Sequence, residues 1–144
     1  MTPDALASAC AARMWSDDQA SAGLGMVLEA VEPGAARLSM RVERRMLNGT
    51  GTCHGGFIFA LADSAFAFAC NTDGQVSVAS HCTITYLRPA REGDLLLAVA
   101  AERQREGRQG IYDVRITCAD AIVAEFRGLS RTTGAKLELS PDAA

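Results

Sequence analysis

Hydrophobic residues follow two different periods along this chain, and the change of period separates predicted strands from predicted helices. Leu38, Met40 and Val42 alternate with polar residues, which is typical of a half-buried strand. Between Gly55 and Cys70 the residues are instead almost all apolar, over a length that suits a buried helix. We predict helices over 3–15 and 55–71, and strands over 26–32, 38–43, 76–87, 94–102, 111–118 and 121–130.

Short turns join most of these elements. Pro33-Gly34 and the segments 91–94 and 106–110 are rich in Gly, Pro, Asp and Glu, as turns are. Consecutive strands joined by such turns pair antiparallel. We therefore expect an α+β fold in which one antiparallel sheet wraps around the apolar helix, in a single domain over residues 1–144. The core is expected over residues 20–133, followed by a flexible tail over 134–144.

The apolar helix also predicts an oligomer. A helix that is hydrophobic on nearly every face must be enclosed, and one sheet covers only one of its sides. A second copy of the chain is the simplest cover for the other side, so we expect at least a homodimer.

Composition narrows the function classes. The formal net charge is −3 and no basic stripe is present, which argues against nucleic acid as a partner. The longest apolar run is too short for a membrane span and contains Asp63, and the N-terminus has no signal-peptide pattern. The five cysteines are odd in number and lack CxxC spacing. We interpret them as buried thiols in a reducing cytoplasm, without disulfides or a metal site.

Asp63 is the one charged residue of the apolar helix. Burying an unpaired carboxylate is unfavourable, so it should meet hydrogen-bond donors or face a polar cavity. Desolvation would raise its pKa and suit it to act as a base or a shielded nucleophile. A structural hydrogen bond or ion pair is the alternative, but no cation lies within one helical turn.

The helix opens with Cys53-His54-Gly55-Gly56. Unpaired N–H groups and a partial positive charge mark a helix start, and glycine allows close approach, so Gly55 and Gly56 could hold a developing oxyanion. A tight turn without a ligand is the alternative. His54 could be an acid/base, an orienting donor or a capping residue, and Cys53 could be a nucleophile with His54 as its base. Asn48 could hold a carbonyl or a water, or form a turn with Gly49.

Geometry separates these groups within one chain. His54 and Asp63 are nine positions apart, about 13 Å along a helix and half a turn around it. Two antiparallel copies could bring the helix start of one chain to Asp63 of the other. We therefore hypothesise two equivalent sites at a dimer interface, each built from both chains.

Several motifs in order resemble a known family. Residues 48–71 follow the pattern N-x-x-G-x-x-HGG-x-x-F-x-LAD-x-AFA-x-A-x-N, and "TITYLRPAREGD", "GRQGIYDVRI" and "FRGLSR" follow at 83–94, 107–116 and 126–131. Together they resemble the hotdog-fold acyl-CoA thioesterases, in particular the PaaI-type proteins of phenylacetate degradation. The similarity covers roughly residues 20 to 133.

The resemblance implies a fold, a reaction and roles for residues. The fold would be a five- or six-stranded antiparallel sheet around a long helix, dimerised through continuous sheets and paired into a homotetramer. The reaction would be hydrolysis of aryl- or acyl-CoA thioesters without a metal or other cofactor, coenzyme A being part of the substrate. Asp63 would be the catalytic carboxylate, acting across the interface. Gly55 and His54 would lie at the thioester carbonyl, with Asn48 assisting.

The resemblance leaves the substrate-binding wall less defined. Relatives place a serine on the next strand to hold the attacking water, but the matching register falls on Ala79, with Ser80 pointing the other way by the period of two. Ser80, His81 and Thr83 remain candidate wall residues, and Gly56 is a candidate contact at the helix start. Arg88, Arg108 and Arg127 could meet the phosphates of coenzyme A, or be surface arginines.

Three alternatives to an aryl-CoA thioesterase stay open. They are a thioesterase for medium-chain acyl-CoA, a non-hydrolytic protein of the same fold that binds or senses acyl-CoA or is purely structural, and a hydratase or dehydratase. The "LAD" helix disfavours the last, which would use a catalytic histidine in a different motif.

Overall fold

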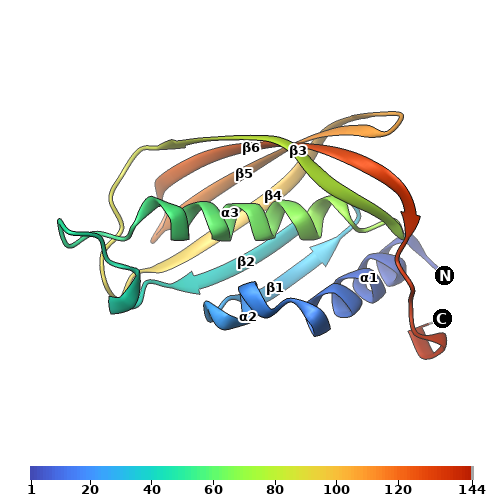
Figure 1. The fold of residues 1–144 in the computed structure, drawn as a ribbon, viewed down its shortest axis with the longest axis horizontal. Coiled ribbons are helices and arrows are strands. Elements are labelled where there is room, and N and C mark those ends of the chain that lie inside the picture. Colours follow the sequence, from blue (N-terminus) through green and yellow to red (C-terminus); the bar gives the residue numbers. More distant parts are fainter. Residues whose placement is uncertain (144) are drawn as a thin grey trace.

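Six antiparallel strands form one sheet that curves around the long helix α3 (Figure 1). The structure is a computed structural model that describes residues 1–143. In the sheet the strand order is β1-β2-β4-β5-β6-β3. The helices are α1 (Pro3–Asp17), α2 (Gln19–Gly23) and α3 (Gly55–Cys70), with short 3-10 turns at Arg44–Met46 and Pro141–Ala143. The strands are β1 (Val27–Glu32), β2 (Ala35–Arg41), β3 (Gln75–Tyr86), β4 (Leu95–Glu106), β5 (Gln109–Cys118) and β6 (Ala121–Lys136).

The α+β class and the antiparallel sheet around a central helix are confirmed, and the architecture is the hotdog fold expected from the resemblance. The ends of several strands differ from the prediction. The strands β4 and β5 continue to a tight turn at Gly107 (φ +57°), so their hairpin is longer than expected. Strand β6 runs to Lys136, which pairs with Gln75, so regular structure continues three residues beyond the expected core boundary at Thr133.

The inner face of the sheet packs on α3 through large apolar side chains. Phe66 is 1% exposed and contacts the rings of Tyr112 and Phe126 at centroid distances of 5.6 and 5.9 Å. Gly128 on β6 makes room for it, because a Cβ at that position would lie 2.8 Å from three atoms of the Phe66 ring. The glycine of "FRGLSR" therefore serves the contact between helix and sheet.

The end of α3 is tied to the start of β3 by a buried amide. Asn71 Nδ2 donates to the carbonyls of Ala67 (2.9 Å) and Ser77 (3.1 Å), and its Oδ1 accepts the Ser77 N–H (2.8 Å). These hydrogen bonds satisfy backbone groups that lack partners at the end of α3, where the chain turns back into β3. Strand β3 consequently runs antiparallel to α3 and ends beside the helix start.

The N-terminal helices cover part of α3, for which the sequence had suggested a second copy of the chain as the simplest cover. Trp15 of α1 packs against Phe68 at a centroid distance of 6.1 Å, and Ser21 of α2 shares a hydrogen bond with Ser64 (2.8 Å between the oxygens). The helix α2 was not predicted; Asp18 caps it by accepting the Ser21 N–H.

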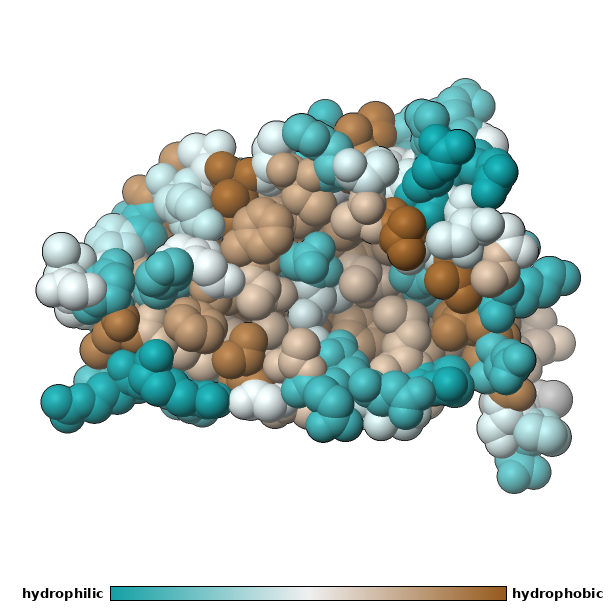
Figure 2. Space-filling model, viewed as in Figure 1, coloured by the Kyte–Doolittle hydropathy of each residue, from teal (hydrophilic) through white to brown (hydrophobic). Residues whose placement is uncertain are grey.

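One stripe of α3 remains uncovered. It consists of an exposed Gly56 and of Ala60, Asp63 and Ala67, which are half-buried. Positions three and four apart lie on one helical face, so these four residues are aligned. Figure 2, viewed onto this side of the molecule, shows a band of apolar surface along the middle.

Candidate active site

The histidine of Cys-His-Gly-Gly caps helix α3. Nδ1 of His54 accepts the N–H of Gly56 at 2.9 Å, and the His54 carbonyl accepts the N–H of Phe57 at 3.0 Å. A nitrogen that accepts an N–H carries no proton, so the neutral ring holds its proton on Nε2. The N–H of Gly55 is left without an acceptor among residues 1–143. The helix start thus presents one free backbone donor and one exposed imidazole.

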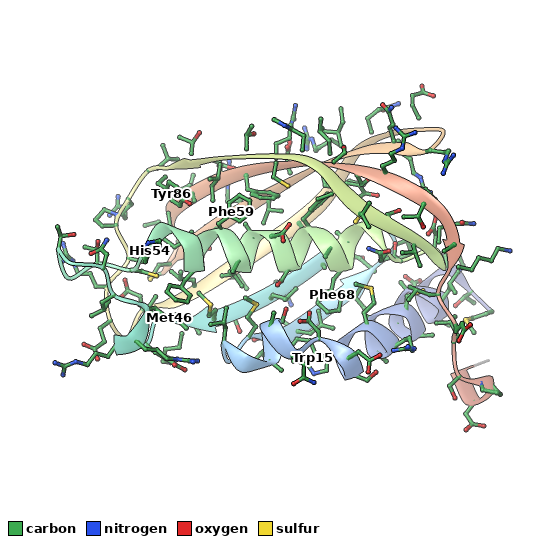
Figure 3. All side chains as sticks on the ribbon, in the orientation of Figure 1. Trp15, Met46, His54, Phe59, Phe68 and Tyr86 are labelled. Carbon is green, nitrogen blue, oxygen red and sulfur yellow. The ribbon has the colours of Figure 1, made fainter. Side chains whose placement is uncertain are left out.

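Tyr86 lies over this helix start, and sequence reasoning did not select it. Its phenol Oη donates to the Gly55 carbonyl at 2.9 Å. A Cβ on Gly55 would lie 3.0 Å from Cζ of the Tyr86 ring, so the ring occupies the space that a side chain would need. Figure 3 shows Tyr86 and His54 at the same end of α3. Strand alternation places Tyr86 on the inner face with Ile84, and that was the available signal.

A cavity of about 370 Å³ opens beside these groups. Its lining comes from the loop before α3, from the first turn of the helix and from the chain that follows β3: Thr52, Cys53, Gly55, Ile58, Tyr86, Leu87, Arg88 and Pro89. Among the predicted substrate contacts, Arg88 therefore shares a cavity with Gly55.

Cys53 is poorly suited to be a nucleophile. Its side chain is buried, burial raises the pKa of its thiol, and Sγ contacts the His54 carbonyl at 3.6 Å. The His54 Nδ1 that could have served as its base is bound to Gly56 instead. A thiol with a raised pKa and no paired base is an inert buried group.

Asn48 organises the loop before the helix. Its Oδ1 accepts the backbone N–H groups of Thr50 (3.0 Å) and Thr52 (3.1 Å), and its Nδ2 donates to the Thr52 hydroxyl (3.0 Å). This is the turn that the sequence left as an alternative. In the single chain the Asn48 amide therefore shapes the loop that leads to His54.

Asp63 lies in the middle of α3 on the uncovered stripe. Within residues 1–143 no hydrogen bond or ion pair reaches its carboxylate, and desolvation raises its pKa. Burial and, after it, the charge of Asp63 raise the pKa of the Cys82 thiol on strand β3. The adjacent Ser64 bonds to Ser21 and not to Asp63. The sequence therefore located an unpaired, partly desolvated carboxylate.

Ser80 lies in a β-bulge of strand β3. Ala79 pairs with Ser130 and His81 with Leu129, so Ser80 is the extra residue of strand β3. Its hydroxyl donates to the Leu129 carbonyl at 3.1 Å. A bulge resets the strict alternation on which the prediction depended. Thr83 is exposed and pairs with Arg127.

The candidate arginines lie in different surroundings. Arg88 lines the cavity at the helix start, whereas Arg108 donates from Nε and Nη2 to the Thr132 carbonyl (3.2 and 3.0 Å), at the other end of β3. Arg127 forms two hydrogen bonds with Asp113 (2.6 and 2.9 Å). Within one chain, the structure therefore groups His54, Gly55, Gly56 and Arg88, and leaves Asp63 and Arg108 apart from them.

Two features of residues 1–143 bear on metal binding and on membrane insertion. Among residues 1–143, no three His, Cys, Asp or Glu side chains gather as a metal-binding group. No helix within these residues is long and apolar enough to span a bilayer.

Sequence and fold comparisons assign the class of protein. Residues 50–125 match the family model of the thioesterase superfamily. This chain belongs to that superfamily.

Individual relatives show which members of the superfamily this chain is similar to. The acyl-coenzyme A thioesterase PaaI of Escherichia coli K12 is 43% identical over 122 residues, which cover 84% of this chain and 87% of that protein. The structure of the E. coli PaaI protein from the phenylacetic acid degradation operon superposes with a TM-score of 0.93 at 40% identity, covering 95% of this chain and all of that one. A mutant of the phenylacetic acid degradation protein PaaI from Thermus thermophilus superposes with a TM-score of 0.78 at 37% identity, covering 80% of this chain and 99% of that one.

Proposed function

We propose that this protein is an acyl-CoA thioesterase that hydrolyses aryl- or arylacetyl-CoA thioesters, such as phenylacetyl-CoA, in aromatic-acid catabolism. The observation that carries the proposal is the unpaired, partly desolvated carboxylate of Asp63 on the open face of α3 in a thioesterase-superfamily domain. The similarity to PaaI acyl-coenzyme A thioesterase supports the substrate class.

Each active site would be shared between two antiparallel copies. Strand β3 is an edge strand; Val78 on it is 50% exposed and Leu87, which directly follows it, is 58% exposed, as is expected of a strand that pairs with another chain. Pairing two β3 strands would set the two α3 helices side by side. Their uncovered stripes are lined by Gly56, Ala60 and Ala67, whose small side chains allow close approach. Further pairing of dimers into a tetramer stays a prediction, as does a cytoplasmic location.

In this dimer the helix start of one chain would receive the thioester carbonyl. The Gly55 N–H is a free donor at the positive end of α3, and the Nε2–H of His54 is a second donor nearby. A well-placed donor at a tetrahedral oxyanion is worth about 3 kcal/mol. Asn48 contributes by shaping the loop that carries His54.

Asp63 of the second copy would act on the carbonyl carbon. It either takes a proton from a water that attacks the carbon, or attacks the carbon itself to give a mixed anhydride that water then cleaves. By either route the C–S bond breaks, the sulfur leaves as the thiolate of coenzyme A, and one water is consumed for each free acid formed. The residues proposed here need no metal for these steps.

The coenzyme A part of the substrate would lie at the dimer interface, near Arg88 of one chain and Arg108 of the other. Arg88 lines the cavity at the helix start. Arg108 lies at the opposite end of β3, so an antiparallel partner would bring its Arg108 toward this cavity. Guanidinium groups bind phosphates through paired N–H donors. Gly56, Ser80 and Thr83 remain candidate wall contacts.

Thiol release from a panel of aryl-, short-chain, medium-chain and long-chain acyl-CoAs tests this function. We expect the highest kcat/KM with arylacetyl-CoA. A preference for medium-chain esters would assign the alternative substrate class, and no thiol release from any ester would overturn the enzyme function.

Asp63→Asn separates hydrolysis from binding. We expect kcat to fall by about 10³-fold or more, because the amide is neither base nor nucleophile, while the affinity for the CoA ester stays within a few-fold. Affinity is measured by calorimetry and turnover by thiol release. A variant that still hydrolyses at the wild-type rate contradicts the role of Asp63.

A further inference from the structure

The phenol of Tyr86 is joined to His54 by a chain of hydrogen bonds through one peptide group. Tyr86 Oη donates to the carbonyl oxygen of Gly55 at 2.9 Å. The N–H at the other end of the same peptide group belongs to Gly56, and it donates to Nδ1 of His54 at 2.9 Å. Three groups from two distant segments are therefore linked in series.

Such a series is cooperative. A hydrogen bond accepted by a peptide carbonyl polarises the group and makes its N–H a better donor. The phenol of Tyr86 thus strengthens the bond that caps the helix with His54. That bond in turn keeps the proton of the neutral imidazole on Nε2, the nitrogen that remains free to donate.

The ring of Tyr86 also restricts the position of Gly55. A Cβ on Gly55 would lie 3.0 Å from Cζ and 3.1 Å from Oη of the phenol, so the glycine is covered closely on this side. The peptide plane is held by the phenol on its oxygen and by His54 on its N–H. The same cavity is lined by Gly55 and Tyr86.

Packing alone does not account for a tyrosine at this position. The side chain is 48% exposed, and the apolar contact with Gly55 would be made equally by a phenylalanine. The hydroxyl is the part that requires tyrosine. Burial raises the pKa of Tyr86 above its usual value of 10, so the phenol stays protonated and donates at every pH near neutrality.

We propose that Tyr86 is a positioning residue for thioester hydrolysis, which holds the Gly55–Gly56 peptide and, through it, the tautomer and orientation of His54. The proposal rests on the proposed function of the helix start. Tyr86 acts here on the carbonyl-binding half of the site, and it comes from the same chain as Gly55, so each chain supplies this half complete.

Tyr86→Phe removes the hydroxyl and keeps the ring. We expect kcat for the best acyl-CoA substrate to fall about tenfold, with KM within twofold, because a preorganised donor loses its support and substrate binding does not. The amide ¹⁵N resonance of Gly56 should shift as the bond to the Gly55 carbonyl is lost, without added substrate. The thermal midpoint should stay within about 2 °C, since the hydroxyl is near the surface.

Tyr112→Phe is the matched control. Tyr112 is the second of the two tyrosines, and its phenol donates to Glu102 at 2.8 Å, in the core and away from the helix start. Tyr112→Phe loses the same hydroxyl, here from a hydrogen bond to a carboxylate. We expect its kcat and the Gly56 resonance to match the wild type, whatever its thermal midpoint.

Three outcomes would overturn the proposal while the wild type still hydrolyses acyl-CoA. They are an unchanged kcat in Tyr86→Phe, an unchanged Gly56 resonance, and an equal loss of kcat in Tyr112→Phe. If the wild type releases no thiol from any ester, the proposed function fails instead. The Gly56 resonance then still reports whether Tyr86 holds this peptide.

Discussion

At the residue scale, the two unusual groups of helix α3 are the carboxylate of Asp63 and the backbone N–H of Gly55. Within residues 1–143 the carboxylate of Asp63 is unpaired and has a raised pKa, and the N–H of Gly55 has no hydrogen-bond acceptor. An unpaired, partly desolvated carboxylate is unfavourable in a purely structural helix. In the proposed dimer, Gly55 of one chain and Asp63 of the other would face the same substrate carbonyl.

The raised pKa of Asp63 predicts how stability depends on pH. Because the pKa in the folded protein lies above the ordinary value of 3.8, ionisation of Asp63 opposes folding at neutral pH, and this penalty disappears when both states are protonated below that value. Asp63→Asn should therefore raise the thermal midpoint at pH 7, by ~1–3 °C for a half-exposed group.

Thermal unfolding of both proteins between pH 3.5 and 8 measures this effect. The gain should shrink as the pH falls toward the ordinary pKa of the carboxyl group. A destabilised Asp63→Asn variant at pH 7 would mean that the carboxylate makes stabilising contacts in the assembled protein.

At the scale of elements, the contact between α3 and β6 determines how the helix packs on the sheet. The ring of Phe66, which is 1% exposed, can pack this closely against strand β6 only because Gly128 has no side chain. The helix is thereby held at a fixed depth and rotation against the inner face. That rotation determines which stripe of α3, including Asp63, stays uncovered.

Gly128→Ala tests this contact. Its Cβ would lie 2.8 Å from the Phe66 ring, so the ring or the strand must move, and we expect a loss of about 1–3 kcal/mol in the free energy of unfolding. Urea denaturation measures it. Gly23→Ala is the control, since nothing lies within 4 Å of a Cβ at that position and its stability should be nearly unchanged. Equal stabilities for the two variants would show that the sheet yields to the added methyl group.

The shared site belongs to the scale of the whole molecule. Within one chain His54 and Asp63 are nine positions apart, which is about 13 Å along α3. In the proposed dimer, an antiparallel copy would complete the site at the open stripe and at the exposed edge of β3.

Mixing two inactive chains tests this assembly. Asp63→Ala and His54→Ala each disable both sites of their own homodimer, but a mixed dimer keeps one site in which both residues are intact. Co-refolding equal amounts should therefore restore about a quarter of the wild-type activity, since random pairing makes half of the dimers mixed. Refolding each variant alone is the control. Complete absence of recovery in the mixture would rule out a site shared in this way.

Much of this protein was determined by local patterns in its sequence. The two periods of hydrophobicity identified the buried helix and the antiparallel strands, and the charge of Asp63 within the apolar run identified the unusual carboxylate. These features could be predicted because they depend on residues a few positions apart, through helical and strand periodicity. The predicted roles of Asp63, His54 and Asn48 still await the experiments above.

Tertiary structure alone decided the surroundings of the site. The contact of Tyr86 with Gly55 joins residues 31 positions apart, and the hydrogen bond between Ser21 and Ser64 spans 43. The bulge at Ser80 depends on the pairing of β3 with β6. Such contacts follow from how the sheet closes on the helix, and no periodicity of a single segment encodes them. The sequence therefore identified the unusual charge, and the fold determined what lies around it.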